Sequence, residues 1–260
     1  MTSEVGIIET VTEAVTDGAA STGMTASEFF YKGLIAVLGE QGKAPIALWI
    51  IAIVFCALLG YFLGSINFAV VISKIKFKDD IRKHGSGNAG ATNMSRTYGK
   101  GAGIATLCGD ILKTVVSVMI ARTLCGDIIA YMTGMFCALG HAFPCYYKFK
   151  GGKCVAVTAA MALTLEPLAF LFTFLVFAAM FATTKYVSMA SISAALMYPL
   201  FLNNVMKMRF GHGDLRVVFV LITCLLVVFL HKENIIRLRD GKENKFSFKK
   251  KDNNEKNSEK

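Results

Sequence analysis

The sequence predicts an all-α, polytopic integral membrane protein with about seven transmembrane helices and its functional site at the cytoplasmic face. The 260 residues are 54% hydrophobic with a mean hydropathy of +0.52, a composition that does not suit a soluble domain. Several apolar runs approach the roughly 20 residues that cross a bilayer. A chain that crosses a bilayer must satisfy its backbone groups internally, and helices do so.

The third observation is where the charge lies. The net charge is +10, but the basic residues sit in loops and in a tail between apolar spans. This placement is typical of chain held against an anionic lipid leaflet, so the bilayer, and not a nucleic acid, is the expected partner. The seven cysteines lie mostly inside apolar runs without a C-x-x-C pair, so they predict neither a metal site nor a disulfide framework.

Three regions differ in composition. Residues 1–44 are acidic and rich in Thr, Ala and Gly, and we expect a poorly ordered extension without chemistry. Within it, Ser27–Leu38 could form a short amphipathic helix. Residues 45–246 form the predicted membrane domain. Residues 247–260 form a charged tail that we expect to be disordered.

The membrane domain divides into seven apolar segments. Their approximate bounds are 46–72, 102–120, 128–147, 154–165, 168–183, 187–202 and 217–230. If the chain starts outside, loops 74–100 and 148–153, Lys185 and the tail all lie in the cytoplasm. The fourth segment is short, and if 154–184 crossed once the tail would lie opposite the Lys153 loop.

Small and charged residues inside the spans carry further information. Gly60, Gly64 and Ser65 would let another helix approach the first span closely. Asp110 and Lys113 share a helix face in the second span, where charges should face the protein interior. They form either a self-neutralising structural pair or part of the site.

The stretch 85–100 (GSGNAGATNMSRTYGK) is the strongest functional signal. Its glycines let backbone N–H groups curve around an anion, and its basic side chains add full positive charge. A phosphate-binding loop therefore fits better than a merely flexible connection. The expected substrate-binding residues are Gly85, Ser86, Gly87, Asn88, Gly90, Thr92, Asn93 and Arg96.

Two further polar clusters fall on the same side of the predicted topology. The second is 140–144 followed by 148–153, where Gly151 and Gly152 allow close approach and Lys153 brings a mobile ammonium. The third runs from His231 to Glu243, with His231 and Asn234 on one helix face. Three donor-rich clusters suit a substrate with more than one phosphoryl group. Without carboxylates at metal-ligand spacing, we expect no metal and no other cofactor.

These clusters resemble the motifs of the bacterial acyl-phosphate:glycerol-3-phosphate acyltransferases, the PlsY family. The family's D-I-R-K-x-G-S-G-N-x-G-A-T-N is matched by residues 80–93, and its G-H-x-F-P-x-F-x-x-F-K-G-G-K-G-V-A-T by residues 140–156 with departures. Its H-R-x-N-I-x-R-L-x-x-G-x-E is matched by residues 231–243, and residues 186–192 are also similar. The resemblance covers about residues 57–246.

The resemblance implies transfer of an acyl group from acyl phosphate to the sn-1 hydroxyl of glycerol-3-phosphate, giving lysophosphatidic acid and phosphate at the cell membrane. It implies that Lys153 and His231 are catalytic and that Ser188, Ser191 and Asn234 bind substrate. The proton of the hydroxyl could pass to the acyl phosphate's own oxygen or to His231 as general base. The enzyme that forms the acyl phosphate is a further implied partner.

The sequence departs from the family at two places. Asn67 stands where many relatives have proline, and Cys154 replaces the last glycine of G-G-K-G. If that position requires a positive φ, cysteine would be strained there by about 1 kcal/mol or more.

The sequence also bears on two other functions. A coenzyme-A-dependent acyltransferase with an H-x-x-x-x-D motif is disfavoured, because no acidic residue stands five positions after any of the four histidines. A transporter or lipid flippase without catalytic activity is the alternative from a different class, and it predicts polar groups distributed through the membrane midplane.

Overall fold

The computed structural model describes residues 25–40 and 45–246, and within these ranges the regular structure is helical, with no strand. The elements are α2 (Ala26–Lys32), α3 (Leu34–Glu40), α4 (Ile46–Ser65), α5 (Phe68–Lys76), η1 (Ile81–Lys83), α6 (Ala91–Tyr98), α7 (Lys100–Cys125), α8 (Asp127–Ala142), η2 (Cys145–Tyr147), α9 (Val155–Leu165), α10 (Pro167–Thr184), α11 (Val187–Phe210), α12 (Arg216–Leu230) and α13 (Lys232–Arg239).

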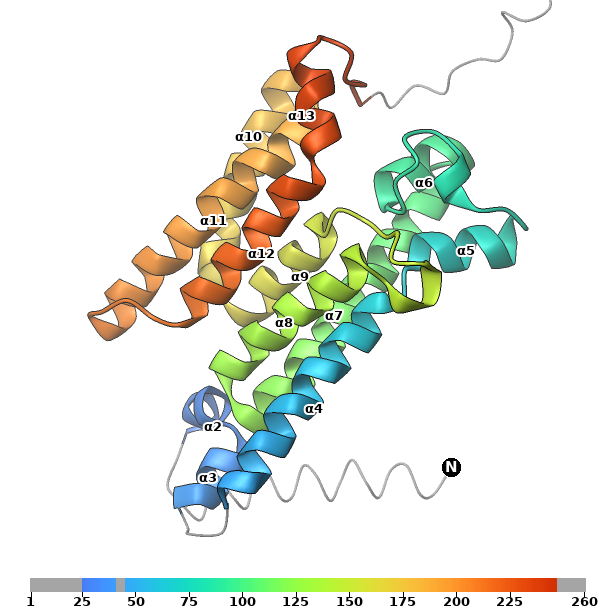
Figure 1. The fold of residues 1–260 in the computed structure, drawn as a ribbon. Coiled ribbons are helices and arrows are strands. Elements are labelled where there is room, and N and C mark those ends of the chain that lie inside the picture. Colours follow the sequence, from blue (N-terminus) through green and yellow to red (C-terminus); the bar gives the residue numbers. More distant parts are fainter. Residues whose placement is uncertain (1–24, 41–44, 247–260) are drawn as a thin grey trace, which may run out of the picture.

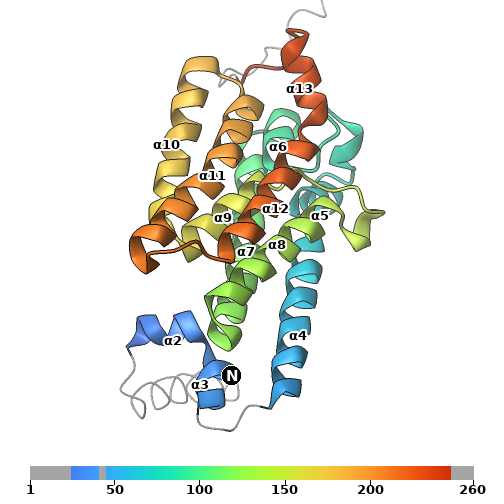
Figure 2. The ribbon, with the colours of Figure 1, turned by 60° about the vertical axis from the view of Figure 1, so that its left-hand side comes forward.

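The long helices form a bundle around α8, which contacts α4, α7, α9 and α12 (Figures 1 and 2). In the described part of the chain, five helices are long and apolar enough to cross a membrane, or six if the bent pair α12–α13 is one span. The fourth predicted segment, 154–165, is α9, whose 11 residues are too few for a full crossing. The all-α membrane class is therefore confirmed, while α9 is a short helix inside the bundle.

The first candidate span, Ile46–Lys76, consists of two helices with a short break between them. Helix α4 stops at Ser65, and the buried Asn67 side chain accepts a hydrogen bond from Val70 N (3.1 Å) to cap a new helix. The second piece, α5, follows this break and completes the candidate span (Figure 1). The sequence predicts one continuous segment, 46–72, because the apolar run continues on both sides of this break.

Glycines on α4 allow close packing as expected. A Cβ atom added at Gly60 would lie 2.5 Å from the Thr133 carbonyl oxygen of α8, and one at Gly64 would collide with the backbone of Cys137. Real Cβ atoms do not approach other atoms this closely, so only glycine lets the two helices meet here.

Loops that are far apart in sequence gather at one end of the bundle, which we call the site end. Lys153 donates to Asn234, Arg96 donates to the Asn244 carbonyl (3.3 Å), and Phe246 N donates to the Lys185 carbonyl (2.9 Å). Lys153 and the C-terminal helix α13 lie at the same end, which does not fit the alternative in which a single crossing by 154–184 puts the tail opposite the Lys153 loop. The loops predicted to share one side of the membrane do share one end.

The opposite end of the bundle, which we call the far end, is covered by α2 and α3 (Figure 2). The expected helix Ser27–Leu38 is broken at Gly33, whose φ of 82° ends α2. Phe29, Ile35 and Val37 are buried, so residues 25–40 pack as part of the fold although we expected poor order there. The rest of the predicted extension, including residues 1–24, and the predicted tail 247–260 lie outside the described residues.

Candidate functional site

All three predicted clusters open on one cavity of about 690 Å³ at the site end. Its mouth is polar, while its inner walls are apolar residues of α9, α10 and α11 such as Ala162, Phe170 and Phe174. The predicted site residues that line it are Gly85, Ser86, Asn88, Gly90, Thr92, Asn93, Arg96, Lys153, Ser188, Ser191, His231 and Asn234. Gly87, Gly151 and Gly152 do not line it.

The first loop is shaped by Asn93, whose side chain is buried. Its Nδ2 donates to the carbonyls of His84 and Asn88 (both 3.0 Å), and its Oδ1 accepts from Ser86 N (3.1 Å). Asn93 therefore holds the loop around itself and leaves the Ser86 side chain exposed at the cavity. Gly85 has a φ of 57°, which only glycine adopts without strain.

Helix α6 begins directly after this loop. Gly90 is its N-cap, and Ala91, Thr92 and Asn93 of the first turn line the cavity. The unpaired N–H groups and the dipole of a helix N-terminus favour an anion at this place. Arg96 lies in the last turn of the same helix and adds an exposed guanidinium at the cavity.

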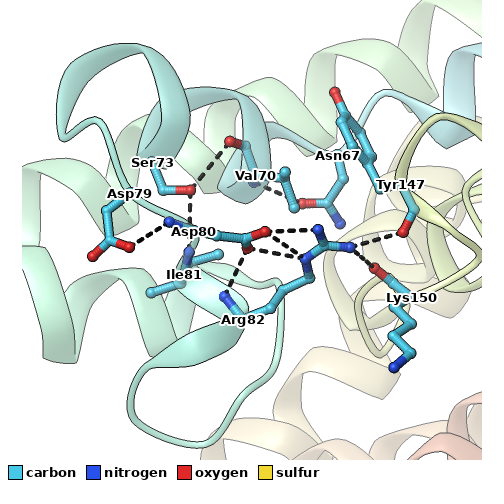
Figure 3. A network of polar contacts seen from close by, with 9 residues as sticks. All are labelled: Asn67, Val70, Ser73, Asp79, Asp80, Ile81, Arg82, Tyr147 and Lys150. Carbon is cyan, nitrogen blue, oxygen red and sulfur yellow. Dashed lines mark hydrogen bonds and ion pairs between the residues drawn. The ribbon is translucent and has the colours of Figure 1, made fainter.

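An ion pair of the first motif holds the second loop (Figure 3). Asp80 and Arg82 are paired at 2.7 Å, and Arg82 Nη1 donates to the carbonyls of Tyr147 (2.8 Å) and Lys150 (3.2 Å). Hydrogen bonding from Arg82 lowers the pKa of Asp80 to about 2. The pair therefore remains charged at neutral pH and ties the first motif to the second.

The second loop closes against the end of α8. Gly151 N donates to the Ala142 carbonyl (3.1 Å) and Gly152 N to the His141 carbonyl (3.0 Å). The departure at Cys154 falls on a residue with a φ of 63°, so the cysteine occupies the left-handed conformation that glycine prefers. Its Sγ donates to the Ala138 carbonyl (3.1 Å), which gives the buried thiol a partner.

A hydrogen-bonded network joins the second and third motifs. Lys153 Nζ donates to Asn234 Oδ1, and Asn234 Nδ2 donates to Glu243 Oε1 (2.7 Å). Glu243 also accepts from Ser188 Oγ and Arg237 Nε (both 2.8 Å). Burial alone would raise the pKa of Glu243, but the three donated hydrogen bonds outweigh it and lower the pKa. The carboxylate therefore remains charged and fixes Asn234.

The mouth of the cavity is electropositive. Burial lowers the pKa of the Lys153 ammonium below its ordinary value of 10.5, and the nearby Arg237 and Arg96 guanidinium groups act in the same direction. The Lys153 ammonium is therefore held near two guanidinium groups, of which Arg237 is paired with Glu243 (2.8 Å), and this favours an anionic ligand beside Lys153 and Arg96. In the described part of the chain no group of three or more His, Cys, Asp or Glu residues could hold a metal.

His231 and Ser191 are held by backbone carbonyls of their own helices. His231 Nδ1 lies 2.7 Å from the Val227 carbonyl oxygen, which can only accept, so Nδ1 carries the proton and Nε2 of the neutral ring has a free lone pair. Ser191 Oγ donates to the Val187 carbonyl (2.8 Å). Both residues line the cavity, so the Nε2 lone pair and the serine oxygen are available as acceptors.

Sequence reasoning missed residues that support the site. Glu243 and Arg237 belong to the third motif, and their position in it could have identified them as residues of the site. The sequence indicates the pair of Asp110 and Lys113, but it shows neither the contact of Lys113 with His141 nor the hydrogen bond from Asn67 to the first loop.

The fold and the cavity define an integral membrane protein that binds anionic groups at one end of its helix bundle, beside an apolar pocket. Residues 54–241 match the family model for glycerol-3-phosphate acyltransferase. The chain belongs to this family and is a membrane glycerol-3-phosphate acyltransferase.

Similar proteins and similar solved structures support the same family. A glycerol-3-phosphate acyltransferase of Bradyrhizobium sp. (strain BTAi1) is 38% identical over 213 residues, which cover 82% of this chain and 100% of the relative. That of Rhodopseudomonas palustris (strain HaA2) is 42% identical over 194 residues, which cover 74% and 95%. The crystal structure of PlsY, an integral membrane glycerol 3-phosphate acyltransferase, in its glycerol 3-phosphate form is similar with a TM-score of 0.69, 36% identity and coverage of 75% and 96%. Its lysophosphatidic acid form has a TM-score of 0.66 at the same identity and covers 75% and 95%. Because the family is enzymatic, the transporter alternative is not retained.

Proposed function

We propose that this enzyme uses acyl phosphate as the acyl donor and transfers the acyl group to the sn-1 hydroxyl of glycerol-3-phosphate. The observation that carries the proposal is the cavity itself, which places two loops suited to anions and three cations beside an apolar pocket. Two phosphorylated reactants need two such places, and an acyl chain needs the pocket. The site faces the cytoplasm in this proposal, because the basic loops gather at the site end.

The first loop binds the acyl phosphate. Ser86, Asn88 and Thr92 present hydroxyl and amide groups at the cavity, and Arg96 adds a guanidinium that matches phosphate geometry. Lys153 lies between this loop and the third motif, where its ammonium can stabilise the leaving phosphate. An acyl phosphate is an activated donor, so the enzyme needs no nucleophilic side chain and no coenzyme A.

Glycerol-3-phosphate binds beside the third motif. Ser191, His231 and Asn234 contribute the polar atoms there, and Glu243 holds Asn234 in place. The sn-1 oxygen attacks the carbonyl carbon, and the bond from that carbon to the phosphate oxygen breaks. The hydroxyl proton ends on the leaving phosphate, either directly or through His231 Nε2.

The acyl chain follows the apolar walls of the cavity. Small residues of α9 and α11, such as Ala159 and Ala194, face aromatic residues of α10, such as Phe174. Phe174 on α10 and Leu107 on α7 are exposed at the protein surface, so the cavity reaches the lipid between α7 and α10. A long chain can therefore extend into the bilayer.

The donor is tested with purified protein in detergent or in vesicles. Palmitoyl phosphate plus glycerol-3-phosphate should release inorganic phosphate and form lysophosphatidic acid in equal amounts, measured by phosphate assay and mass spectrometry. Palmitoyl-coenzyme A in place of palmitoyl phosphate should give no product. Product from the coenzyme A donor alone would overturn the proposal for the donor.

The role of His231 is tested by His231→Ala at saturating glycerol-3-phosphate. If the acyl phosphate takes the proton directly, KM for glycerol-3-phosphate rises and kcat remains near that of the wild type. If His231 is the general base, kcat falls by about 10²-fold or more.

A further inference from the structure

A buried charged trio lies beneath the site, and no step of the proposed reaction uses it. Lys113 Nζ on α7 lies 2.8 Å from Asp110 Oδ1 and 3.0 Å from His141 Nδ1 of α8. The three residues are between 2% and 5% exposed. Charged groups at membrane depth are costly and are kept where they have a function, so the trio needs an explanation beyond neutralising itself.

The Lys113 ammonium also holds the end of α4. Nζ donates to the Gly64 carbonyl (2.9 Å) and to the Ile66 carbonyl (2.7 Å), two of the carbonyls that a helix C-terminus leaves unpaired. The next residue is Asn67, whose Nδ2 donates to the Ala89 carbonyl of the first loop (3.1 Å). Lys113 is thus connected to the loop that binds the first anion.

The same ammonium is connected to the second loop through His141. The His141 carbonyl accepts from Gly152 N, directly before Lys153. The Gly152 Cα packs against the imidazole so closely that an added Cβ would collide with His141 Nε2 and lie 2.8 Å from the Ala89 carbonyl oxygen. The two loops therefore meet at Gly152, and the backbone on each side of this meeting point is held by Lys113.

We propose that Lys113 is a positioning residue for acyl transfer, which sets the separation of the two anion-binding loops and so of the two bound reactants. The inference rests on the proposed function. Asp110 neutralises the ammonium inside the span. His141 acts through Nδ1, which must be an acceptor because an ammonium only donates, so the ring hydrogen is on Nε2.

The rival role for His141 is direct chemistry through Nε2, since the residue also lines the cavity. Two substitutions separate the roles, because asparagine places its amide oxygen where Nδ1 lies and glutamine places its amide where Nε2 lies. For His141→Asn we expect kcat within threefold of the wild type. For His141→Gln and His141→Phe we expect a fall in kcat of tenfold or more, with KM for glycerol-3-phosphate changed less than threefold. The reverse order of His141→Asn and His141→Gln would overturn the proposal.

Lys113 itself is tested in a charge-balanced background. Lys113→Met leaves Asp110 buried without its cation and can fail to fold, so the matched variant is Asp110→Asn with Lys113→Met. Binding of glycerol-3-phosphate, measured by calorimetry, counts the sites that are folded. We expect binding within threefold of the wild type and kcat per binding site reduced thirtyfold or more.

A kcat per binding site equal to that of the wild type would show that Lys113 only stabilises the fold and would overturn the inference. The comparison uses whichever acyl donor gives lysophosphatidic acid with the wild type. A failure of the proposed donor therefore shows in the wild type, whereas a failure of this inference shows only in the ratio of variant to wild type.

Discussion

The two ends of the bundle both carry clustered charged side chains, but they arrange them differently. At the far end Arg216 pairs with Asp214 (2.6 Å) and Asp127 (3.4 Å), and Arg122 pairs with Asp127 (2.6 Å). At the site end Arg96 and Lys153 line an open cavity, and neither forms an ion pair with a described carboxylate within 4.0 Å. Charges that satisfy one another stabilise a fold, while cations left facing a cavity are available to substrate anions.

The far end also includes a part of the chain that precedes the family match. The Arg216 guanidinium lies over the rings of Tyr31 (5.2 Å) and Phe210 (4.9 Å), and Gly126 packs against the backbone of Tyr31 and Lys32. Helix α2 therefore closes the far-end ion network from outside. Changes there should alter stability and leave the chemistry of folded molecules unchanged, and changes at the site end should do the opposite.

The largest stability effect is expected for Arg216→Met. The side chain is 3% exposed, and its removal leaves Asp214 without its ion-pair partner, while Asp127 keeps Arg122. Leaving one buried carboxylate without its partner costs about 3–5 kcal/mol in unfolding free energy. Denaturant titration in detergent measures the loss, and kcat per glycerol-3-phosphate binding site should match the wild type. The control is Arg239→Met, whose side chain is 76% exposed and whose pair with Asp240 should contribute at most about 1 kcal/mol.

The largest catalytic effect is expected for Lys153→Ala. Loss of the ammonium that stabilises developing charge should lower kcat by at least about 10²-fold. Melting temperature should remain within a few degrees of the wild type, because Lys153 faces a cavity and not the core. Lys207→Ala, an exposed lysine near the far end, is the matched control and should leave kcat unchanged. Near-normal turnover of Lys153→Ala would remove Lys153 from the mechanism.

The pH dependence of kcat/KM is a second test of the role of Lys153. Because burial lowers the pKa of Lys153, the ammonium is lost as pH rises through a value below 10.5. The proton is present below that pKa, so kcat/KM should be constant at neutral pH and fall on the alkaline side. In Lys153→Arg the guanidinium remains charged, and the residual kcat/KM should lose this alkaline decline. An unchanged alkaline limb would assign it to another group.

Alanine substitutions at two closely packed glycines, one at each end of the bundle, test the same difference through steric contact. An alanine at Gly152 would collide with the His141 ring and move Lys153, and a misplacement of about 1 Å can cost about 10²-fold in rate. An alanine at Gly126, with a φ of 81°, would instead collide with the Tyr31 and Lys32 carbonyls. We expect Gly152→Ala to lower kcat about tenfold or more with a small change in melting temperature. Gly126→Ala should lower the melting temperature and leave kcat per binding site unchanged.

The helical membrane class and the three polar clusters could be predicted because they are local patterns. Hydropathy marks the spans, and Gly85–Arg96 and Gly151–Lys153 combine glycine with basic residues in short stretches. The end of α4 could not be predicted in this way, since the Asn67 cap does not interrupt the apolar run.

Contacts between residues that are far apart in the sequence could not be predicted. Asn93 belongs to a motif that suggests ligand binding, yet its amide is used by the loop's own backbone. Lys113 and His141 are 28 positions apart on different helices, and only the packing of α7 on α8 brings them together. A pattern shows which side chains are polar, whereas the fold decides whether their hydrogen-bonding groups are used internally or left for a ligand.

The smallest effect is expected at Cys154, the residue after Lys153, where two substitutions isolate backbone strain. Cys154→Ala and Cys154→Gly both lose the Sγ bond to the Ala138 carbonyl, but only glycine adopts a φ of 63° freely. The left-handed conformation costs a residue with a Cβ about 1–2 kcal/mol, and the greater freedom of glycine in the unfolded chain offsets about 0.5–1 kcal/mol of that. The glycine variant should therefore be the more stable of the two by about 1 kcal/mol or less. Turnover of both should stay within about threefold of the wild type, because Lys153 keeps its bond to Asn234. An alanine variant more stable than the glycine variant would mean that this backbone position carries no strain for the cysteine to bear.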